Sequence, residues 1–537
     1  MKAFKIYISL VLSLSTLFGC NGDSDLLGDE DPCTPIQAFQ LLSVKALGDK
    51  NFIATWENVS DADKYEVHII EPKTNVANKL GNTEENSFQF TYDSILDSNI
   101  EVFVNAENSC SSIKSNELTI LNDEIVSSIG YLKRKNGAMS SSDFAFGGEI
   151  LTLSADGRFL ALGAPSEDNL ASGLSQSGAV YIYEKSASNK WEEKTKIQSP
   201  SPKLGGLFGG DVDFDSSGNR LVVSAVGERK VFVFDRREDN WDESAVLISP
   251  VDSSDVSEFG DSISISDNGN RIVVGDTNSP TLNSGVAHIY TLSNIGWSDS
   301  GYIQASDYSD GDNFGSAVKL NAKGNQLVVG APRADNTQSD SGAVYVFSLD
   351  SSSNWRQLNR LASPNEQQGD LFGNYLDMSS DGSVIVASKL YDFGVVNQSQ
   401  VYIFSENEGE YELDIVSPII NDSSDQFGVG ISISPNGKLV AVAAPFEGAS
   451  SVGIDEDAIN NDSSLSGAVY LFEYDQDTMQ WIESSFIKAI VSDQADTFGY
   501  KLDIVDDFLA VFARGEDSAS EDPNDNNSNN SGAVYIY

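Results

Sequence analysis

A repeated pattern of apolar and polar positions fills residues 146–537. Each copy contains an alternating stretch such as 427–434, a short polar turn, a nearly continuous apolar run such as 327–329, and a second alternating stretch such as 343–347. Alternation is typical of strands with one buried face, and a short apolar run is typical of a strand buried on both faces. A further stretch that often begins at Trp comes last. The pattern therefore predicts four short strands in each copy.

Each copy begins at a Phe-Gly pair, and the pairs recur at intervals of about 50 to 70 residues. Units of that length, rich in short strands, are typical of β-propellers. The sequence thus predicts an all-β chain whose main part, residues 124–537, is a seven-bladed β-propeller. We expect the Phe of each pair to be a structural residue of its blade; these residues are Phe146, Phe208, Phe259, Phe314, Phe372, Phe427 and Phe498.

The two ends of the repeated region are incomplete. The last copy stops at residues 533–537 without a fourth strand, and residues 125–133 precede the first Phe-Gly pair. We expect 125–133 to form the outer strand of the seventh blade, because this arrangement closes the ring and covers an open sheet edge.

Residues 33–122 lack the repeat and contain short alternating stretches separated by turns, which predicts a small β-sandwich. The segments Ala54-Thr55-Trp56-Glu57 and Lys64-Tyr65-Glu66-Val67 resemble a fibronectin type III domain, in which a core Trp and a Tyr begin neighbouring strands. The resemblance implies either a spacer or a binding module. It also implies that the start of the domain lies near the loop before its last strand.

Two of the three cysteines, Cys33 and Cys110, lie at those two places. An even pair in an exported chain predicts one disulfide between them. Two unpaired thiols are the alternative.

The first twenty residues form a targeting segment. Lys2 and Lys5 precede an apolar run over 6–18, which is too short to span a bilayer and is typical of a signal peptide. The run ends at Leu17-Phe18-Gly19-Cys20, which resembles the bacterial lipobox. The resemblance implies lipidation at Cys20, a flexible acidic tether over 21–32, and an outer-membrane location facing the surface or the periplasm. An ordinary secretion signal with a chance Cys is the alternative.

The charge of the chain narrows the range of partners. The sequence has 81 acidic and 33 basic residues, a formal net charge of −48. Such a chain repels nucleic acids and anionic membrane surfaces, so the membrane contact that we expect is through the lipid alone. Cations, basic proteins and neutral glycans remain possible partners. Only two histidines, His68 and His288, are present, which disfavours chemistry that needs several histidines.

The repeats resemble the FG-GAP repeats of the integrin α-subunit propeller and its bacterial relatives. The resemblance is carried by the Phe-Gly pairs, by Gly163-Ala-Pro165 and Gly330-Ala-Pro332, and by Ser-Gly-Ala-Val-Tyr segments that begin at residues 177, 341, 466 and 531. It implies a seven-bladed propeller that acts in adhesion or protein contact at a cell surface.

The calcium loops of the integrin-type propeller do not carry over to this chain. Its turns between first and second strands are short, as in Ser154-Ala-Asp-Gly157, and cannot supply the oxygen ligands that calcium needs. Acidic residues gather instead in the loops between second and third strands. These loops predict either weak divalent-cation sites, for example for Ca²⁺, or merely solvated polar surface; the candidate ligands are Asp455, Asp457, Asp462, Glu516 and Asp517.

The sequence therefore favours a lipid-anchored, non-enzymatic binding or adhesion protein of the cell surface. We expect the propeller loops to contact a protein or glycan ligand, because loops on a rigid scaffold carry binding more often than strands do. No catalytic residue is identified. The alternatives are a carbohydrate-active or glycan-binding propeller and a periplasmic assembly scaffold.

Overall fold

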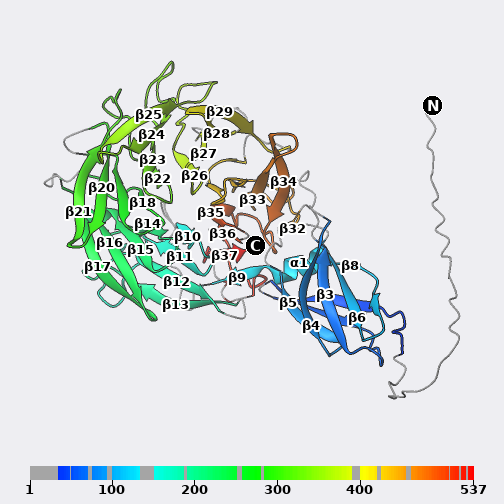
Figure 1. Cartoon of the computed structure of the whole chain (residues 1–537). Coiled ribbons are helices and arrows are strands. Elements are labelled where there is room, and N and C mark those ends of the chain that lie inside the picture. Colours follow the sequence, from blue (N-terminus) through cyan, green and yellow to red (C-terminus); the bar gives the residue numbers. More distant parts are fainter. Residues whose placement is uncertain are drawn as a thin grey trace, which may run out of the picture.

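The computed structural model of the chain is all-β, and Figure 1 shows a ring of sheets with a smaller unit at one side. The structure describes residues 34–537 apart from 49, 71–74, 93–99, 134–149, 187–189, 251–256, 280–282, 390–399, 420–424, 455–460, 507, 519, 521, 528 and 529. Of the predicted site residues, Cys20, Cys33, Phe146, Asp455 and Asp457 lie outside the described residues.

Two antiparallel sheets make up the N-terminal unit, residues 34–121. Phe52, Ala54 and Trp56 alternate inward from one sheet, and Tyr65 and Val67 alternate inward from the other. Their side chains share one core, in which the Trp56 and Tyr65 rings lie 5.3 Å apart. One sheet contains β1 (Leu41–Gly48), β2 (Asn51–Trp56) and β5 (Ser87–Thr91), and the other contains β3 (Lys64–Ile70), β4 (Ala77–Thr83), β6 (Glu101–Glu107), β7 (Ser112–Lys114) and β8 (Leu118–Thr119).

Strand β4 was not expected from the sequence. Its residues, Ala-Asn-Lys-Leu-Gly-Asn-Thr, include a single large apolar side chain, and none of the seven is buried. It lies at the edge of its sheet and pairs only with β3 among the described strands. An edge strand with two polar faces lacks the alternation on which strand prediction depends.

Seven further sheets follow one another around the ring. In each of them the described strands run antiparallel, and the second strand is almost wholly buried, as in β11, β23 and β31. Their strands are β10–β13 (Leu151–Leu153, Phe159–Ala164, Ala179–Lys185, Trp191–Ile197), β14–β17 (Phe208–Phe214, Arg220–Ala225, Lys230–Arg237, Asn240–Ile248), β18–β21 (Ile263–Ile265, Arg271–Asp276, Val286–Ser293, Gly296–Ile303), β22–β25 (Ala317–Leu320, Gln326–Ala331, Ala343–Leu349, Trp355–Leu361), β26–β29 (Tyr375–Met378, Val384–Ser388, Val401–Asn407, Glu410–Val416), β30–β34 (Ile431–Ile433, Leu439–Ala444, Gly453–Ile454, Ala468–Asp475, Gln480–Lys488), and β35–β37 (Phe498–Val505, Phe508–Ala513, Ala533–Ile536) with β9 (Gly130–Leu132).

Strand β9 pairs antiparallel with β37 and is the outer strand of the last sheet, so the two ends of the repeated region meet in one sheet. The predicted strand 125–133 is wrong in its first part, because Asn122–Ser128 form the helix α1. Ile125 and Ile129 are spaced by four residues and are both buried. A spacing of four places both side chains on one face of a helix and also on one face of a strand, so the spacing alone does not choose between the two.

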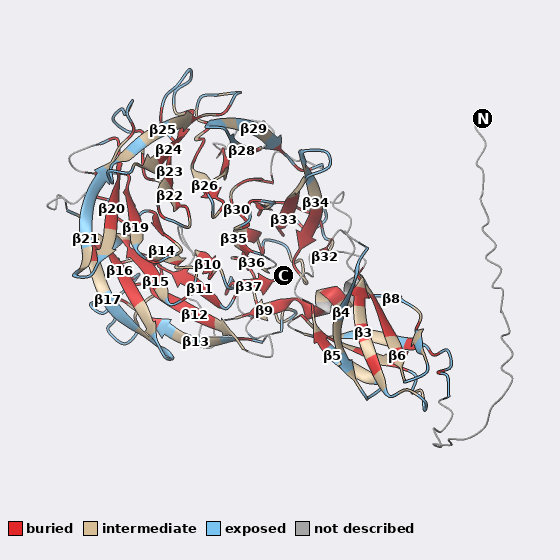
Figure 2. Ribbon diagram, viewed as in Figure 1, coloured by how far each residue is buried: buried red, intermediate tan, exposed pale blue. Residues whose placement is uncertain are grey.

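Burial follows the radius of the ring. Figure 2 shows buried residues on the inner strands and exposed residues along outer strands such as β17 and β21. Apolar side chains of consecutive sheets pack together, as Phe159 packs against Phe214 and Trp241 of the next sheet. The Phe residues of the six described Phe-Gly pairs are 0–2% exposed. Each of these six lies 5.4–5.7 Å from an aromatic ring of the third strand of its own sheet.

Two glycines permit the close approach of neighbouring sheets. Gly178 precedes a third strand and has φ +81°, and a Cβ there would lie 2.1 Å from the carbonyl oxygen of Phe208 in the next sheet. Gly209 follows Phe208 and has φ +91°, with the carbonyl oxygen of Ala179 at 2.6 Å from such a Cβ. Only glycine adopts this backbone and leaves this space.

The N-terminal unit joins the ring through an apolar junction. Helix α1 packs against β1 on one side and β32 on the other. Ile125 of this helix and Ile129, which directly follows it, belong to a single core cluster that includes Trp56 of the unit and Tyr537 of the ring. Lys50 donates its backbone N–H to the carbonyl of Ser128 at 2.7 Å. The unit and the last sheets therefore share one continuous core.

Candidate functional site

The first strands of all seven sheets line a cavity of about 310 Å³ on the axis of the ring. Its lining includes five aspartates and two lysines, which is unusual for residues within strands. Two sets of residues on these strands, two positions apart, define the site.

The first set is named the closing ring here. It contributes one residue from each sheet, each opposite the middle of the buried second strand. Its members are Thr152, Asp213, Ser264, Lys319, Asp377, Ser432 and Asp503.

Five members of the closing ring hydrogen-bond to the backbone of the next sheet around the ring. A first strand is the edge of its sheet, and its N–H groups that face the axis of the ring lack a strand partner. The side chains supply that partner. The carboxylates of Asp213, Asp377 and Asp503 accept from the N–H groups of Ile265, Ile433 and Leu153 at 2.7–2.9 Å, and the hydroxyls of Ser264 and Ser432 accept from those of Leu320 and Ile504 at 3.1–3.3 Å.

Lys319 stands among the three carboxylates of this ring. Its Nζ lies 3.4 Å from Asp377 Oδ1, and the negative charges of Asp377, Asp213 and Asp503 raise the pKa of its ammonium. The Ser432 hydroxyl lies 3.1 Å from Asp377 Oδ2 and 3.0 Å from Asp503 Oδ1. The Ser432 hydroxyl has one proton and can donate to only one of these two carboxylates at a time. The Lys319 ammonium therefore offsets the remaining negative charge.

Two carboxyl groups of the closing ring hold their protons more tightly than in water. Burial raises the pKa of Asp213 to about 6, against the opposing effect of Lys319. Burial also raises the pKa of Asp503. Both groups are therefore protonated more readily than a solvated carboxyl group.

The second set is named the mouth ring. It lies two residues nearer to the Phe-Gly pairs, at the end of the sheets where the loops between second and third strands emerge. Gly178, Gly342 and Gly467, at the ends of three such loops, bridge the Phe of the next sheet. The members of the mouth ring are Ile150, Asp211, Ser262, Ala317, Tyr375, Gly430 and Lys501.

The charged members of the mouth ring differ in how they are held. Asp211 Oδ2 accepts from the N–H of Ile263 at 2.7 Å, and burial raises the pKa of its carboxyl to about 7. Lys501 reaches across the position of Gly430 and places its Nζ 5.2 Å from the centre of the Tyr375 ring. Burial lowers the pKa of Lys501, and Asp211 partly reverses that effect.

The acidic loop residues that were predicted as cation ligands do not form a site among the described residues. Glu516 is 2% exposed, and its carboxylate pairs with Lys133 Nζ at 2.7 Å. Asp517 accepts a hydrogen bond from the N–H of Asn530, and Asp462 lies on the surface. No group of three His, Cys, Asp or Glu within the described ranges could hold a metal ion. The charge of Glu516 is thus already engaged by Lys133, which follows β9.

Cys110 is disulfide-bonded, while its predicted partner Cys33 lies outside the described residues, so their pairing stays a prediction. His288 lies in the core of its sheet, 1% exposed, between the rings of Phe259 and Tyr302. Its Nε2 is 3.9 Å from Asp276 Oδ2, which is beyond hydrogen-bonding distance.

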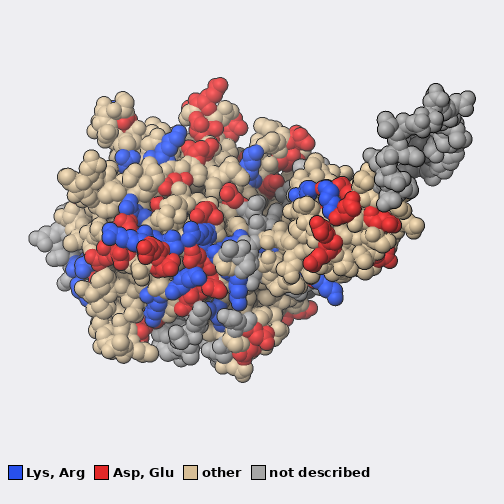
Figure 3. Space-filling view, turned by 60° about the horizontal axis from the view of Figure 1, so that its bottom comes forward, with Lys and Arg blue, Asp and Glu red and all other residues tan. Residues whose placement is uncertain are grey.

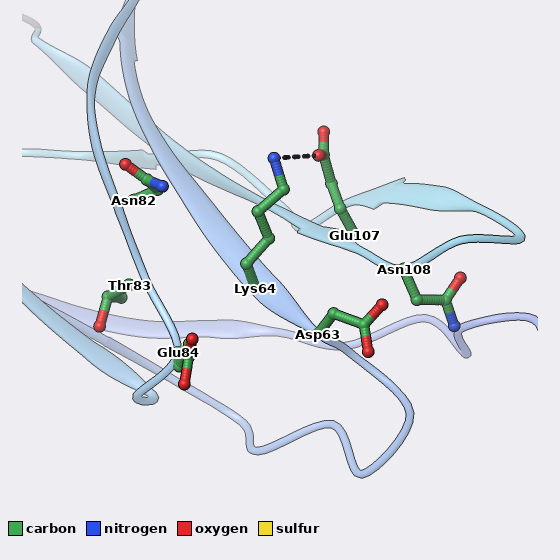
Figure 4. A pocket seen from close by; sticks show the side chains of 7 residues that line it. All are labelled: Asp63, Lys64, Asn82, Thr83, Glu84, Glu107 and Asn108. Atoms are coloured by element: carbon green, nitrogen blue, oxygen red, sulfur yellow. Dashed lines mark ion pairs between the residues drawn. The ribbon is translucent and has the colours of Figure 1, made fainter.

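A second hollow of about 440 Å³ lies on the N-terminal unit (Figure 4). Its only cationic side chain, Lys64, is held by Glu66 and Glu107, each at 2.9 Å. Hydrogen bonds from Lys79 and Lys64 lower the pKa of Glu66 to about 2. The hollow is open and polar, with its lysine already paired. The remaining lining residues are Asp63, Asn82, Thr83, Glu84 and Asn108.

On the face shown in Figure 3, Lys and Arg side chains lie beside Asp and Glu side chains. Ion pairs of this kind include Arg158 with Glu184 and Arg220 with Asp235, both at 2.6 Å. Among the described residues, no helix has the length and apolarity needed to cross a membrane.

The sequence contains a signal for the axial cavity that the predictions above did not use. Asp211, Asp213, Lys319, Lys501 and Asp503 interrupt strands whose alternate positions are apolar. A charge repeated at one register position of several repeats indicates a shared axis. The residue counts from Phe to this position differ in the first copy, which hides the alignment.

Comparisons with known proteins support the repeat and leave the function open. Among curated proteins, none matches this sequence. Solved structures that are similar include Kuenenia stuttgartiensis hydrazine synthase (13% identity, 71% of this chain and 96% of that chain, TM-score 0.44) and Pseudomonas aeruginosa periplasmic gluconolactonase (16%, 80% and 97%, TM-score 0.43). At these identities and TM-scores the likenesses carry no argument about activity. Residues 297–347 match the FG-GAP repeat family, so this chain contains an FG-GAP repeat.

Proposed function

We propose that the chain is a lipid-anchored, non-enzymatic surface protein that binds a protein or glycan ligand. In this proposal a seven-bladed FG-GAP propeller is the binding platform, and a fibronectin type III-like sandwich connects it to lipidated Cys20. The seven successive sheets, the FG-GAP match over 297–347 and the Trp56–Tyr65 core support the two domains. A disulfide between Cys33 and Cys110 would fix the start of the sandwich.

The observation that carries the proposal is the use of the closing ring. Paired carboxylates on the axis of a propeller could serve general acid–base catalysis. Here Asp213, Asp377 and Asp503 accept backbone N–H groups of neighbouring sheets and surround Lys319. Carboxylates with these commitments hold the ring together, which favours a scaffold whose ligand contacts lie at the mouth and loops.

The shared core between the N-terminal unit and the ring supports a display role. Because α1 packs between β1 and β32, the unit cannot swing freely from the last sheets. Such a junction holds the ring at a fixed orientation relative to the N-terminal unit, which the tether connects to the anchor.

The anchor and the location are tested in cells that produce the full chain. We expect metabolic labelling with a fatty-acid analogue, and external protease should reach the propeller in intact cells. Cys20→Ala should abolish labelling and release the chain, while Cys110→Ala should leave labelling intact. Unchanged labelling of Cys20→Ala would refute the lipid anchor, and full protection from protease would favour the periplasmic scaffold.

A further inference from the structure

The mouth ring contains polar side chains that the fold does not use. Within the described residues, the Lys501 ammonium and the Tyr375 hydroxyl of the mouth ring make no hydrogen bond and no ion pair, and neither does the side-chain amide of Asn374, which lines the cavity next to Tyr375. All three residues are half-buried and line the axial cavity. The closing ring, two positions away on the same strands, has nearly every polar group engaged.

Small residues line the cavity beside these groups. Gly430 lies between Tyr375 and Lys501 in the order of sheets, and Ala317 on the other side of Tyr375 has only a methyl group. The cavity of about 310 Å³ is at the low end of the range of small-molecule sites, about 300–1,000 Å³. It therefore has room for a small polar ligand, or for the end of a larger one.

The charges exclude an anionic ligand. Five aspartates and two lysines line the cavity, and one of the lysines, Lys319, is surrounded by carboxylates. A metal ion is also disfavoured, because no suitable group of ligands exists among the described residues. A neutral molecule with many hydroxyl groups matches the remaining chemistry, since carboxyl, amide and ammonium groups all hydrogen-bond to hydroxyls.

We propose that the mouth ring binds the terminal neutral sugar residue of a glycan. Tyr375 presents an aromatic face to the C–H surface of the sugar ring, and Lys501, Asn374 and Asp211 bind its hydroxyls. The closing ring forms the floor of the site, so only one end of the glycan can enter. The inference rests on the proposed function as a binding protein and names the ligand class of its propeller.

The test uses the full chain in detergent and fluorescently labelled neutral gluco-, manno-, galacto- and xylo-oligosaccharides, with binding read as fluorescence anisotropy. We expect one series to bind, and Tyr375→Ala and Lys501→Met each to weaken that binding at least about tenfold, the loss of one strong contact. Matched controls are Tyr308→Ala, an exposed tyrosine before β22, and Lys194→Met on outer strand β13; both should bind as the wild type. Free monosaccharide of the same series should compete.

Thermal unfolding of each variant shows whether it folds. If Tyr375→Ala or Lys501→Met does not fold, the milder variants Asn374→Ala and Tyr375→Phe are tested in its place. Absence of binding to every series overturns the proposal. Binding that survives in both Tyr375→Ala and Lys501→Met also overturns the proposal. A loss of binding in Tyr308→Ala would then place the ligand on the loops. The proposed surface function fails separately, through the labelling and protease experiments, so the two failures are distinguishable.

Discussion

The closing ring and the mouth ring lie two residues apart on the same seven strands, yet their side chains have different roles. In the closing ring, Asp213, Asp377 and Asp503 bind the next sheet and share Lys319. In the mouth ring, Lys501 and Tyr375 contact each other and leave their polar atoms unused within the described residues. The difference shows that burial of charge near the axis does not by itself indicate a functional site; what matters is whether the backbone already uses the charge.

The largest test of this comparison is Lys319→Met in the closing ring. Loss of the ammonium leaves Asp213, Asp377 and Asp503 without a counterion, and removing one partner of a buried ion pair costs about 3–5 kcal/mol. Because the Lys319 side chain is 37% exposed, we expect a smaller loss, about 2–3 kcal/mol of unfolding free energy at pH 8. Urea unfolding measures it.

The loss in Lys319→Met should shrink at pH 5, because Asp213, whose pKa is raised to about 6, takes up a proton there and needs the ammonium less. The matched control is Lys194→Met on β13, which we expect to change stability by less than about 0.5 kcal/mol. Equal stabilities of the two variants would contradict the role assigned to the closing ring.

A second test is Ser432→Ala. The hydroxyl accepts from the N–H of Ile504 and lies between two carboxylates, so its loss leaves a backbone donor without its partner. We expect a destabilisation of about 1–2 kcal/mol in urea. Ser316→Ala, whose hydroxyl makes only a 3.5 Å contact to Gly330, should cost less than half as much. A larger loss in Ser316→Ala than in Ser432→Ala would contradict the role assigned to Ser432 in the closing ring.

The sequence predicts much of this architecture and little of the site. Apolar runs such as 327–329 and the Phe-Gly pairs predict the strands of the ring, because burial on two faces constrains residue type strongly. Segment 125–133 was only partly predicted, since the spacing of Ile125 and Ile129 also suits a helix that fits the junction. Such a choice depends on contacts with β1 and β32, which a local pattern does not contain.

The site depends even more on distant residues. Asp503 and Leu153 are 350 positions apart, and Lys319 is defined by aspartates from three other sheets. Individually, each charge looks like the polar face of an alternating strand. Only closure of the ring shows that this face points to a shared axis and not to solvent.

A third test uses pH. Burial raises the pKa of Asp211 to about 7, above its value of about 3.9 in an unfolded chain. The folded state therefore binds more protons between about pH 4 and pH 7, and this residue's contribution to stability falls as pH rises through that window. We expect Asp211→Asn, which keeps an acceptor for the N–H of Ile263, to stabilise the chain by about 1 kcal/mol at pH 8.

The stabilising effect of Asp211→Asn should be smaller at pH 5 than at pH 8, and it should disappear only below about pH 4, where the carboxyl is protonated in the folded and the unfolded chain alike. Thermal unfolding at the two pH values measures both effects. A stabilisation that is independent of pH would show that Asp211 is not protonated in the folded state. The pKa of this carboxyl in the mouth ring would then not differ from that of a solvated carboxyl.

The smallest expected effect on stability is that of Lys501→Met, and it sharpens the comparison most. Burial lowers the pKa of Lys501, so the fold disfavours its charged form, and no described group hydrogen-bonds to it. We expect a change of less than about 0.5 kcal/mol in urea unfolding, in either direction, although the same variant should weaken glycan binding strongly. Lys319→Met should behave in the opposite way, with a large loss of stability. If Lys501→Met destabilises the chain as much as Lys319→Met, then both lysines serve the fold and the mouth ring has no free group to offer a ligand.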